Sequence, residues 1–223
     1  STASSTWNYN YIFNANEDVA STSRYEIRDR FSASLNWRHN FFGDYKTSVG
    51  VFYEGRTGRP FSYVFTNDAN GDGRSGNDLF YVPNAPGDVL FGSLSSSGVF
   101  TPDPAMENRF FEWLEQNQDL QRYRGGHVDK NGGRASWVNS FDIRVSQELP
   151  GFFNGHKSEI WLDIMNVGNL INSDWGHIYD YGFFANRRVL TAAGIYDGKY
   201  VYSNFDPSRV EPPTIANNSN SIG

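Results

Sequence analysis

The chain has 223 residues, a net charge of −6 and 38% hydrophobic residues, and it contains no cysteine. The acidic balance argues against non-specific nucleic-acid binding, which needs an excess of Lys and Arg, so no nucleic-acid partner is expected. The lack of cysteine excludes a disulfide scaffold, Cys-ligated zinc and thiol catalysis. Aromatic residues make up 17% of this polar chain, which favours β structure.

The first strong pattern along the chain is an alternation with a period of two over residues 31–41. Mostly apolar residues at odd positions alternate with polar residues at even positions. The apolar ones are Phe31, Ala33, Leu35, Trp37 and Phe41, and the polar ones are Ser32, Ser34, Asn36, Arg38 and Asn40. Gly43-Asp44 is a turn signal, the alternation resumes over 45–54, and after Gly58-Arg59-Pro60 it continues with Phe61, Tyr63 and Phe65. This pattern predicts a long antiparallel hairpin, and a weaker alternation over 7–13 predicts an earlier strand.

Two further hairpins are predicted downstream. Alternation over 137–149 and over 160–164, separated by a turn that begins at Pro150, indicates the second hairpin. A weaker pair, 189–196 and 199–205, is joined at Asp197-Gly198. The pattern as a whole predicts about seven strands in an all-β, antiparallel fold.

The connections between these strands differ greatly in length. Short turns alternate with two long stretches, 66–135 and 172–186. The first long stretch contains a predicted helix, because Asp103 is a capping residue, Pro104 suits a first helical turn and a partly apolar stripe follows. The stripe consists of Met106, Phe110, Trp113, Leu114 and Leu120.

Two folds explain the alternation. In a soluble sandwich the apolar face packs on a second sheet, whereas in an outer-membrane barrel it faces lipid and the polar residues line the interior. Strands of about 11 residues, aromatic residues near strand ends and alternating short and long connections favour the barrel. So does the charge on the opposite face: Arg38, Lys46, Glu54, Arg56, Asp142, Arg144, Glu148, Glu159 and Asp163.

Several motifs resemble the C-terminal barrel of TonB-dependent outer-membrane receptors, and in particular their Oar-like (OmpA-related) branch. The likeness covers most of residues 30–202. The motifs, in this order, are GRPFSY (58–63), NDLFYVP (77–83), Arg124-Gly125, FDIRVSQELP (141–150), DIMNVGNLIN (163–172) and DWG (174–176).

The resemblance implies a transmembrane barrel of about 22 strands, closed around a plug domain, in the outer membrane of a Gram-negative bacterium. Such a receptor binds an extracellular ligand at its loops and imports it with energy delivered through TonB. On this basis residues 1–223 are expected to form the C-terminal portion of one barrel domain, without a plug, and 66–135 a long extracellular loop. The expected partners are membrane lipid, the remaining strands and plug, and the TonB system.

The sharpest local motif is DANGDGRSGND, residues 68–78. It matches the first half of an EF-hand-type loop, in which carboxylate and amide oxygens at alternate positions turn inward around calcium. At position 12, where an EF-hand loop has an acidic residue, this chain has Leu79. The predicted calcium ligands are therefore Asp68, Asn70, Asp72, the backbone carbonyl of Arg74, and Asp78; the alternative is a polar loop without an ion.

No enzyme is predicted. The four histidines are scattered without metal-ligand spacing, and the polar lining of a barrel explains the acidic pairs on single strand faces. The alternative to a receptor is a secreted or surface-attached β-sandwich, an adhesin or carbohydrate-binding module that calcium stabilises.

Overall fold

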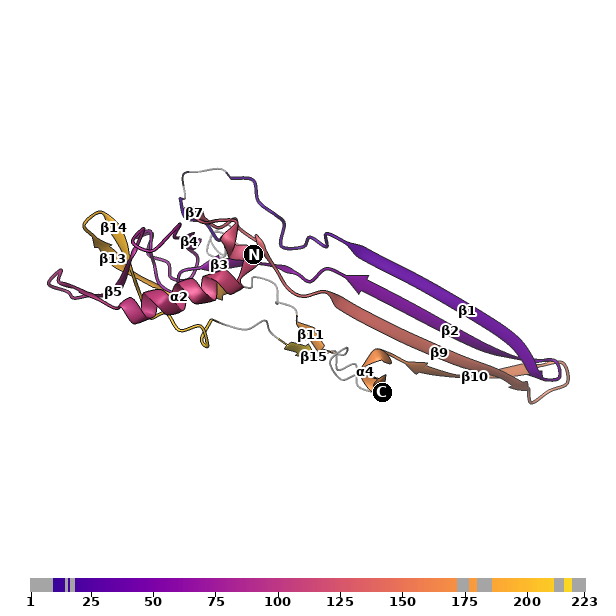
Figure 1. Cartoon of the computed structure of the whole chain (residues 1–223). Coiled ribbons are helices and arrows are strands. Elements are labelled where there is room, and N and C mark those ends of the chain that lie inside the picture. The colour runs from indigo at the N-terminus through magenta and orange to yellow at the C-terminus, as the bar shows by residue number, and fades with distance from the viewer. Residues whose placement is uncertain are drawn as a thin grey trace. The chain divides into compact units, whose positions relative to one another are not determined.

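The computed structural model describes residues 10–14, 16, 19–171, 177–179, 186–210 and 215–217 (Figure 1). Its elements are mostly strands, as predicted, with three helices among the described residues. Most strand pairs are antiparallel, but the pairs of residues 186–188 with 62–64 and of 201–202 with 90–91 are parallel. The chain divides into two units. The sheet unit comprises 27–58, 135–180 and 214–223, and the loop unit comprises 1–26, 59–134 and 181–213.

The sheet unit contains a four-stranded sheet in the order β1-β2-β9-β10. Its strands are β1 (Arg30–Phe42), β2 (Tyr45–Arg56), β9 (Val138–Pro150) and β10 (Lys157–Ile164), and all neighbours are antiparallel. Both predicted hairpins are therefore confirmed, but the predicted continuation of the first one through Phe61, Tyr63 and Phe65 is wrong, because β2 ends at Arg56 and those residues belong to the loop unit. The unit also holds α4 (Gly168–Ile171) and a small pair formed by β11 (His177–Tyr179) and β15 (Ile215–Asn217).

The two short turns of this sheet lie at one end, as the two predicted hairpins require, whereas the third predicted short turn, Asp197-Gly198, belongs to another sheet. The turn at Gly43, whose φ of +61° is the left-handed conformation that glycine adopts most readily, lies at the same end as the turn between β9 and β10 (Figure 1). At the opposite end Arg56 pairs with Val138. The connection 57–137, which includes the long stretch 66–135, thus leaves and re-enters the sheet at the end away from the short turns.

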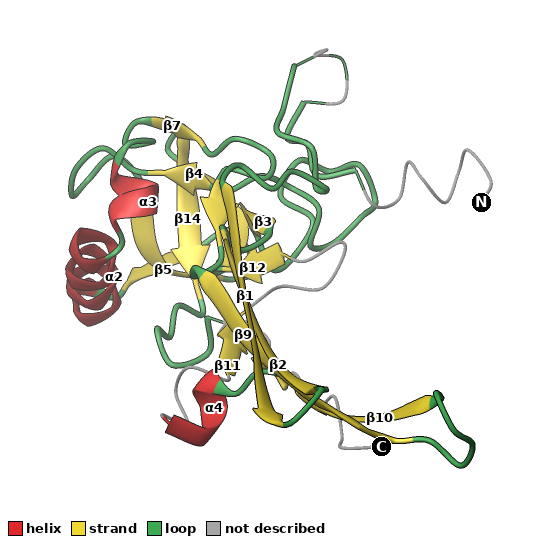
Figure 2. Cartoon of the chain, turned by 90° about the vertical axis from the view of Figure 1, so that its right-hand side faces the viewer, coloured by secondary structure: helices red, strands yellow, loops and turns green. Residues whose placement is uncertain are grey.

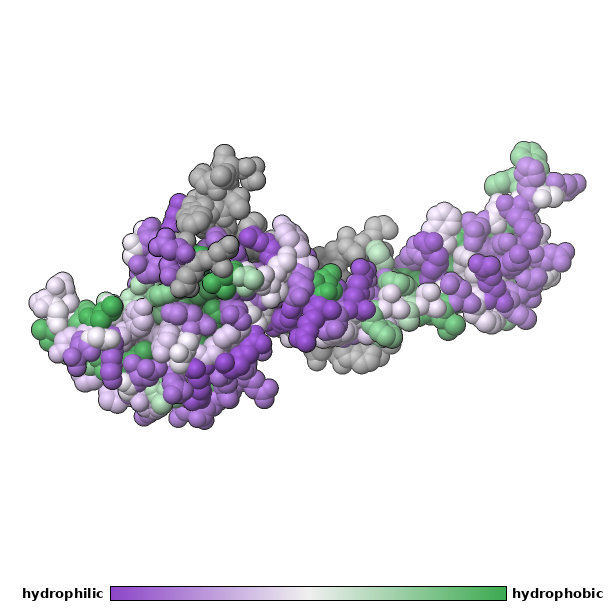
Figure 3. Space-filling view, turned by 90° about the horizontal axis from the view of Figure 1, so that it is seen from above, coloured by the Kyte–Doolittle hydropathy of each residue, from purple (hydrophilic) through white to green (hydrophobic). Residues whose placement is uncertain are grey.

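The register gives this sheet one apolar and one polar face. Leu35 pairs with Val51, which pairs with Ile143, and the same rows repeat every second residue. Apolar side chains are open to solvent: Phe31 is 65% exposed, Leu35 68%, Ile160 60% and Leu162 60%. Hydrophobic residues appear among hydrophilic ones on the visible surface (Figure 3).

The opposite face of the sheet carries the charged residues that the pattern assigned to it. Arg38, Glu54, Arg144 and Asp163 share this face by register. Phe52 and Trp161 lie on it too, 41% and 66% exposed, so the polar face is not uniformly polar.

Small sheets and two helices form the loop unit (Figure 2). β3 (Pro60–Val64) lies between β12 (Asn186–Arg188) and β8 (Gly133–Arg134), and β4 (Tyr81–Val82) pairs with β7 (Gly126–His127). A four-stranded sheet has the order β13 (Thr191–Tyr196), β14 (Lys199–Ser203), β5 (Leu90–Leu94) and β6 (Phe100–Pro102). The helices are α2 (Pro104–Gln116) and α3 (Gln118–Gln121).

The predicted helix is confirmed as α2, although Leu120 of its predicted apolar stripe lies in α3. The Asp103 carboxylate accepts a hydrogen bond from the Met106 amide at 2.9 Å, which satisfies one of the free N–H groups of the first turn. The helix buries Met106, Phe110 and Leu114 against an aromatic core, whereas Trp113 is half-buried beside Phe205. The core rings are Phe65, Phe80, Phe91, Phe110, Tyr202 and Phe205.

The predicted third hairpin exists, but it does not extend the long sheet. β13 and β14 pair across Asp197-Gly198, and β14 then pairs with β5 from the long stretch. Val201 and Tyr202 are both fully buried, so this strand is covered on two faces. The stretch 66–135 is thus part of a folded unit that also includes 186–210.

Of the strand expected over 7–13, residues 7–9 lie outside the described residues, and the described part, residues 10–13, is not in a strand. Among the described residues, no helix has the length and apolar character needed to span a membrane.

Candidate metal centre

The acidic loop 67–78 connects β3 to β4, and its two ends are fixed by neighbouring strands. The Asn67 amide donates to the Ala192 carbonyl at 2.8 Å and accepts from the Ala192 amide at 2.9 Å. At the other end, the Asp78 carbonyl accepts from the Phe65 amide at 2.9 Å. The loop therefore leaves and rejoins well-packed backbone.

Glycines allow this loop to turn back on itself. Gly71, Gly73 and Gly76 have φ values of +80°, +83° and +77°, where an L side chain is strained. The turn brings three amides to Asp68: its Oδ1 accepts from Gly71 at 2.7 Å and from Asp72 at 3.1 Å, and its Oδ2 from Gly73 at 2.8 Å. The Asp68 carboxylate thus organises the first half of the loop.

Asp78 is a fully buried carboxylate. Its Oδ2 accepts from the Ala69 and Asn70 amides at 2.5 and 3.2 Å, while its Oδ1 has no partner among the described residues. Burial raises the pKa of Asp78, and the neighbouring Asp72 and Asp68 carboxylates raise it further against the effect of the two amides. A cation bound beside Asp78 would oppose this shift and favour the ionised carboxylate.

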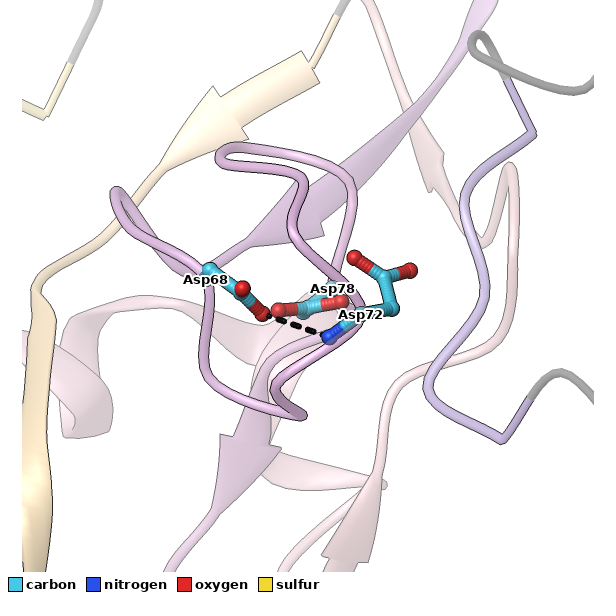
Figure 4. A group of neighbouring side chains, drawn as sticks. All are labelled: Asp68, Asp72 and Asp78. Atoms are coloured by element: carbon cyan, nitrogen blue, oxygen red, sulfur yellow. Dashed lines mark hydrogen bonds between the residues drawn. The ribbon is translucent and has the colours of Figure 1, made fainter.

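Oxygens of Asp68, Asp72 and Asp78 lie within 4.8 Å of one another. In the close-up view the Asp78 carboxylate lies between the other two (Figure 4). Two oxygens on opposite sides of a calcium ion are separated by about 4.6–5.2 Å, twice the metal–oxygen distance. The three carboxylates are thus close enough to share a metal ion.

The other two predicted ligands have different roles in the structure. Asn70 Oδ1 accepts from the Asp72 amide at 2.9 Å, and Asn70 Nδ2 donates to the Phe13 carbonyl at 2.9 Å. The Arg74 amide donates to Asp72 Oδ1 at 2.8 Å. Both residues shape the loop, whereas Leu79, at the position where an EF-hand has its last acidic ligand, forms an isolated bridge with Val64.

Sequence reasoning missed one residue of this cluster, Asn77. The residue is 7% exposed, and its Nδ2 donates to Asp72 Oδ2 at 3.1 Å. Its Oδ1 is buried and has no partner among the described residues. The EF-hand spacing takes every second residue from Asp68 and therefore skips Asn77. The available signal was that this amide residue directly precedes Asp78.

A second group of charged side chains lies in a hollow on the polar face of the long sheet. The Arg144 guanidinium donates to both Asp163 oxygens, at 2.5 and 2.6 Å, and Asp142 accepts from the Asn166 amide at 2.8 Å. Residues lining the hollow include Arg38, Asp142, Arg144, Glu159 and Asp163. Because Asp163 is held by Arg144, a Glu159–Asp163 acid–base pair gains no support from this geometry.

No protein-family model, curated protein or solved structure matches the chain. The candidate site therefore rests on its own geometry: a cluster of hard oxygen donors with two buried oxygens that have no partner in the described part of the chain.

Proposed function

We propose that this chain forms part of the wall of an outer-membrane β-barrel receptor that imports a ligand with energy from TonB. The observation that carries the proposal is the open apolar face of the β1-β2-β9-β10 sheet. Side chains such as Leu35 and Leu162 are exposed, and moving their apolar surface from water into hydrocarbon is favourable by about 25 cal/mol per Å². A contiguous apolar face of this kind marks a contact surface with lipid or protein.

Strand length supports lipid as the contact. β1 and β9 have 13 residues each and β2 has 12. A tilted strand of about 9–11 residues crosses a bilayer, so these strands suffice with residues to spare at both interfaces. Aromatic side chains occur towards the ends, with Phe41 and Phe42 at one end of β1 and Trp137 next to β9, as interfacial girdles require.

The edges of the sheet support a larger barrel. Within the described residues, β1 pairs only with β2 in this sheet, and β10 only with β9. In a bilayer, no water is available to hydrogen-bond the backbone groups along those edges, so they need partners from other strands. Further strands on both sides would close the barrel, and the polar face with Arg38 and Arg144 would then line its interior.

The connections assign the two ends of this wall. Outer-membrane barrels have short periplasmic turns and long extracellular loops. The turn at Gly43 would be periplasmic, and the end at Arg56 and Val138 extracellular. The loop unit would therefore belong to the extracellular side, where a receptor recognises its ligand.

Spin labels at neighbouring positions test the membrane proposal, because the chain has no cysteine to remove. Leu35→Cys and Asn36→Cys are matched sites, since both residues are exposed but point to opposite faces of β1. In the full chain reconstituted into lipid, we expect a label at Leu35 to collide readily with oxygen and rarely with a water-soluble nickel complex. The label at Asn36 should show the reverse. Equal accessibility to the nickel complex at both sites would contradict a lipid-facing sheet.

For the acidic loop we propose calcium as the ion. All candidate donors are oxygens, which suits a hard cation, and a glycine-rich loop accommodates the irregular shells that calcium accepts and magnesium does not. We expect calcium to bind the metal-free chain with a Kd of about 10⁻⁴–10⁻³ M, the range of extracellular modules, and magnesium to bind more weakly.

Calorimetric titration of matched variants tests this site. Asp78→Asn removes the buried charge and should abolish calcium binding. Asp197→Asn is the control, since it removes a carboxylate from an exposed turn of the same unit and asparagine tolerates the local φ of +49°. Wild-type affinity in Asp78→Asn, or no binding by the wild-type chain, would overturn the calcium proposal.

A further inference from the structure

The loop 67–78 contacts a segment near the N-terminus through main-chain and side-chain groups. The Ile12 amide donates to the Asn77 carbonyl at 3.1 Å, and Asn70 Nδ2 donates to the Phe13 carbonyl at 2.9 Å. The Phe13 ring stacks on His127 with 3.8 Å between centroids, and Tyr11 is buried. The segment Asn10–Asn14 is thus docked on the loop and on its neighbour β7.

Asn77 belongs to both the acidic cluster and this contact. Its side-chain nitrogen lies 3.1 Å from Asp72 Oδ2, which places the amide group at the cluster. Its side-chain oxygen is buried and unpartnered among the described residues, and a buried carbonyl oxygen without a partner costs about 1–3 kcal/mol. A cation shared with Asp78 Oδ1, the other such oxygen of the loop, would satisfy both.

We infer that Asn77 is a further ligand of the ion and that it couples ion binding to the docking of the segment Asn10–Asn14. The inference rests on the calcium site proposed above. It does not depend on the membrane proposal, because every residue that carries it lies in the loop unit.

The coupling arises because Asn77 makes both contacts: its side chain lies at the acidic cluster, and its backbone carbonyl accepts from the Ile12 amide. Without the ion, Asp68, Asp72 and Asp78 repel one another, and the glycines offer little resistance to opening of the loop. Opening displaces Asn77 and with it the carbonyl that holds the Ile12 amide. With the ion bound, the Asn77 side chain is held and its carbonyl keeps its position. Calcium and the segment therefore stabilise each other's bound state, and the coupling must be reciprocal.

Amide hydrogen exchange on the full chain, with calcium and with a chelator, tests the first half of the coupling. We expect calcium to slow exchange at Ile12 by about 5- to 150-fold, the usual range of coupling between sites. The amide of Leu35 in β1 serves as the internal reference and should not respond. In Asn77→Ala the calcium Kd should rise by at least the ten- to hundredfold typical of losing a supporting residue at a metal site. Asn77→Asp keeps the side-chain oxygen and should restore both binding and protection.

Reciprocity supplies the second half. Phe13→Ala weakens docking of the segment and should raise the calcium Kd, although Phe13 is not a candidate ligand. Val19→Ala, at a 64% exposed position of the same region, should leave the Kd unchanged. Calcium binding that leaves Ile12 exchange unaffected, or wild-type affinity in Asn77→Ala, would overturn this inference while the calcium site stands. An absence of calcium binding in the wild-type chain would overturn the site and the inference together.

Discussion

Replacing Leu35 with Arg is expected to destabilise the membrane-inserted chain by about 2–4 kcal/mol if the residue lies near the bilayer midplane, and by less towards an interface. Leu35 lies mid-strand in β1, opposite Val51, on the apolar face. In lipid the guanidinium would have to leave water or thin the bilayer around it. The change would be measured as the shift in reversible unfolding of the chain in lipid vesicles.

Ser34→Arg is the matched control for this substitution. Ser34 is also exposed, precedes Leu35 on the same strand and belongs to the polar face, where Asp142 lies in the same row. It should change stability by less than about 0.5 kcal/mol, as exposed substitutions do. If Leu35→Arg is equally tolerated, the sheet faces water, since Leu35 is 68% exposed and an arginine there would then have little cost.

Periodicity predicted the long sheet well because the two faces of its strands differ in polarity, and this difference appears in the sequence as an alternation with a period of two. In β1 the alternation runs from Phe31 to Phe41, and the structure has the strand from Arg30 to Phe42. The turn at Gly43 was equally readable, because its positive φ calls for glycine. The pairing of β2 with β9 was not readable from either strand alone, since 66–135 separates them in the sequence.

The loop unit was harder to predict for a physical reason. Its strands are short, and several are covered on both faces. Tyr63, Val64 and Phe65 are buried in succession, so the alternation predicted from Phe61 onward does not separate a buried face from an exposed one. Such strands are specified by tertiary packing, as when β14 joins β5 from a distant part of the chain. The helix α2 was predictable because its cap is local to Asp103 and Pro104.

At the acidic loop, spacing identified Asp68, Asp72 and Asp78, which the structure brings together. It assigned Asn70 to the ion, whereas its amide bridges Asp72 and Phe13. Asn77 escaped because its importance comes from burial and from a partner in the N-terminal segment. A motif encodes which oxygens are available, but packing decides which of them lack partners.

Phe110→Ala is expected to lower the stability of the loop unit by about 3–5 kcal/mol, the usual cost of deleting a buried ring and leaving a cavity. Phe110 is fully buried at the centre of the aromatic core, with ring centroids of Phe91 and Phe205 both 5.1 Å away. These rings come from three separate parts of the chain, α2, β5 and the segment after β14, so the loss should weaken the unit as a whole. Phe111→Ala is the control. Phe111 is the next residue of the same helix but is only half-buried, so its loss should destabilise the unit distinctly less. Urea unfolding followed by aromatic circular dichroism measures both variants, and equal losses would show that α2 does not pack through Phe110.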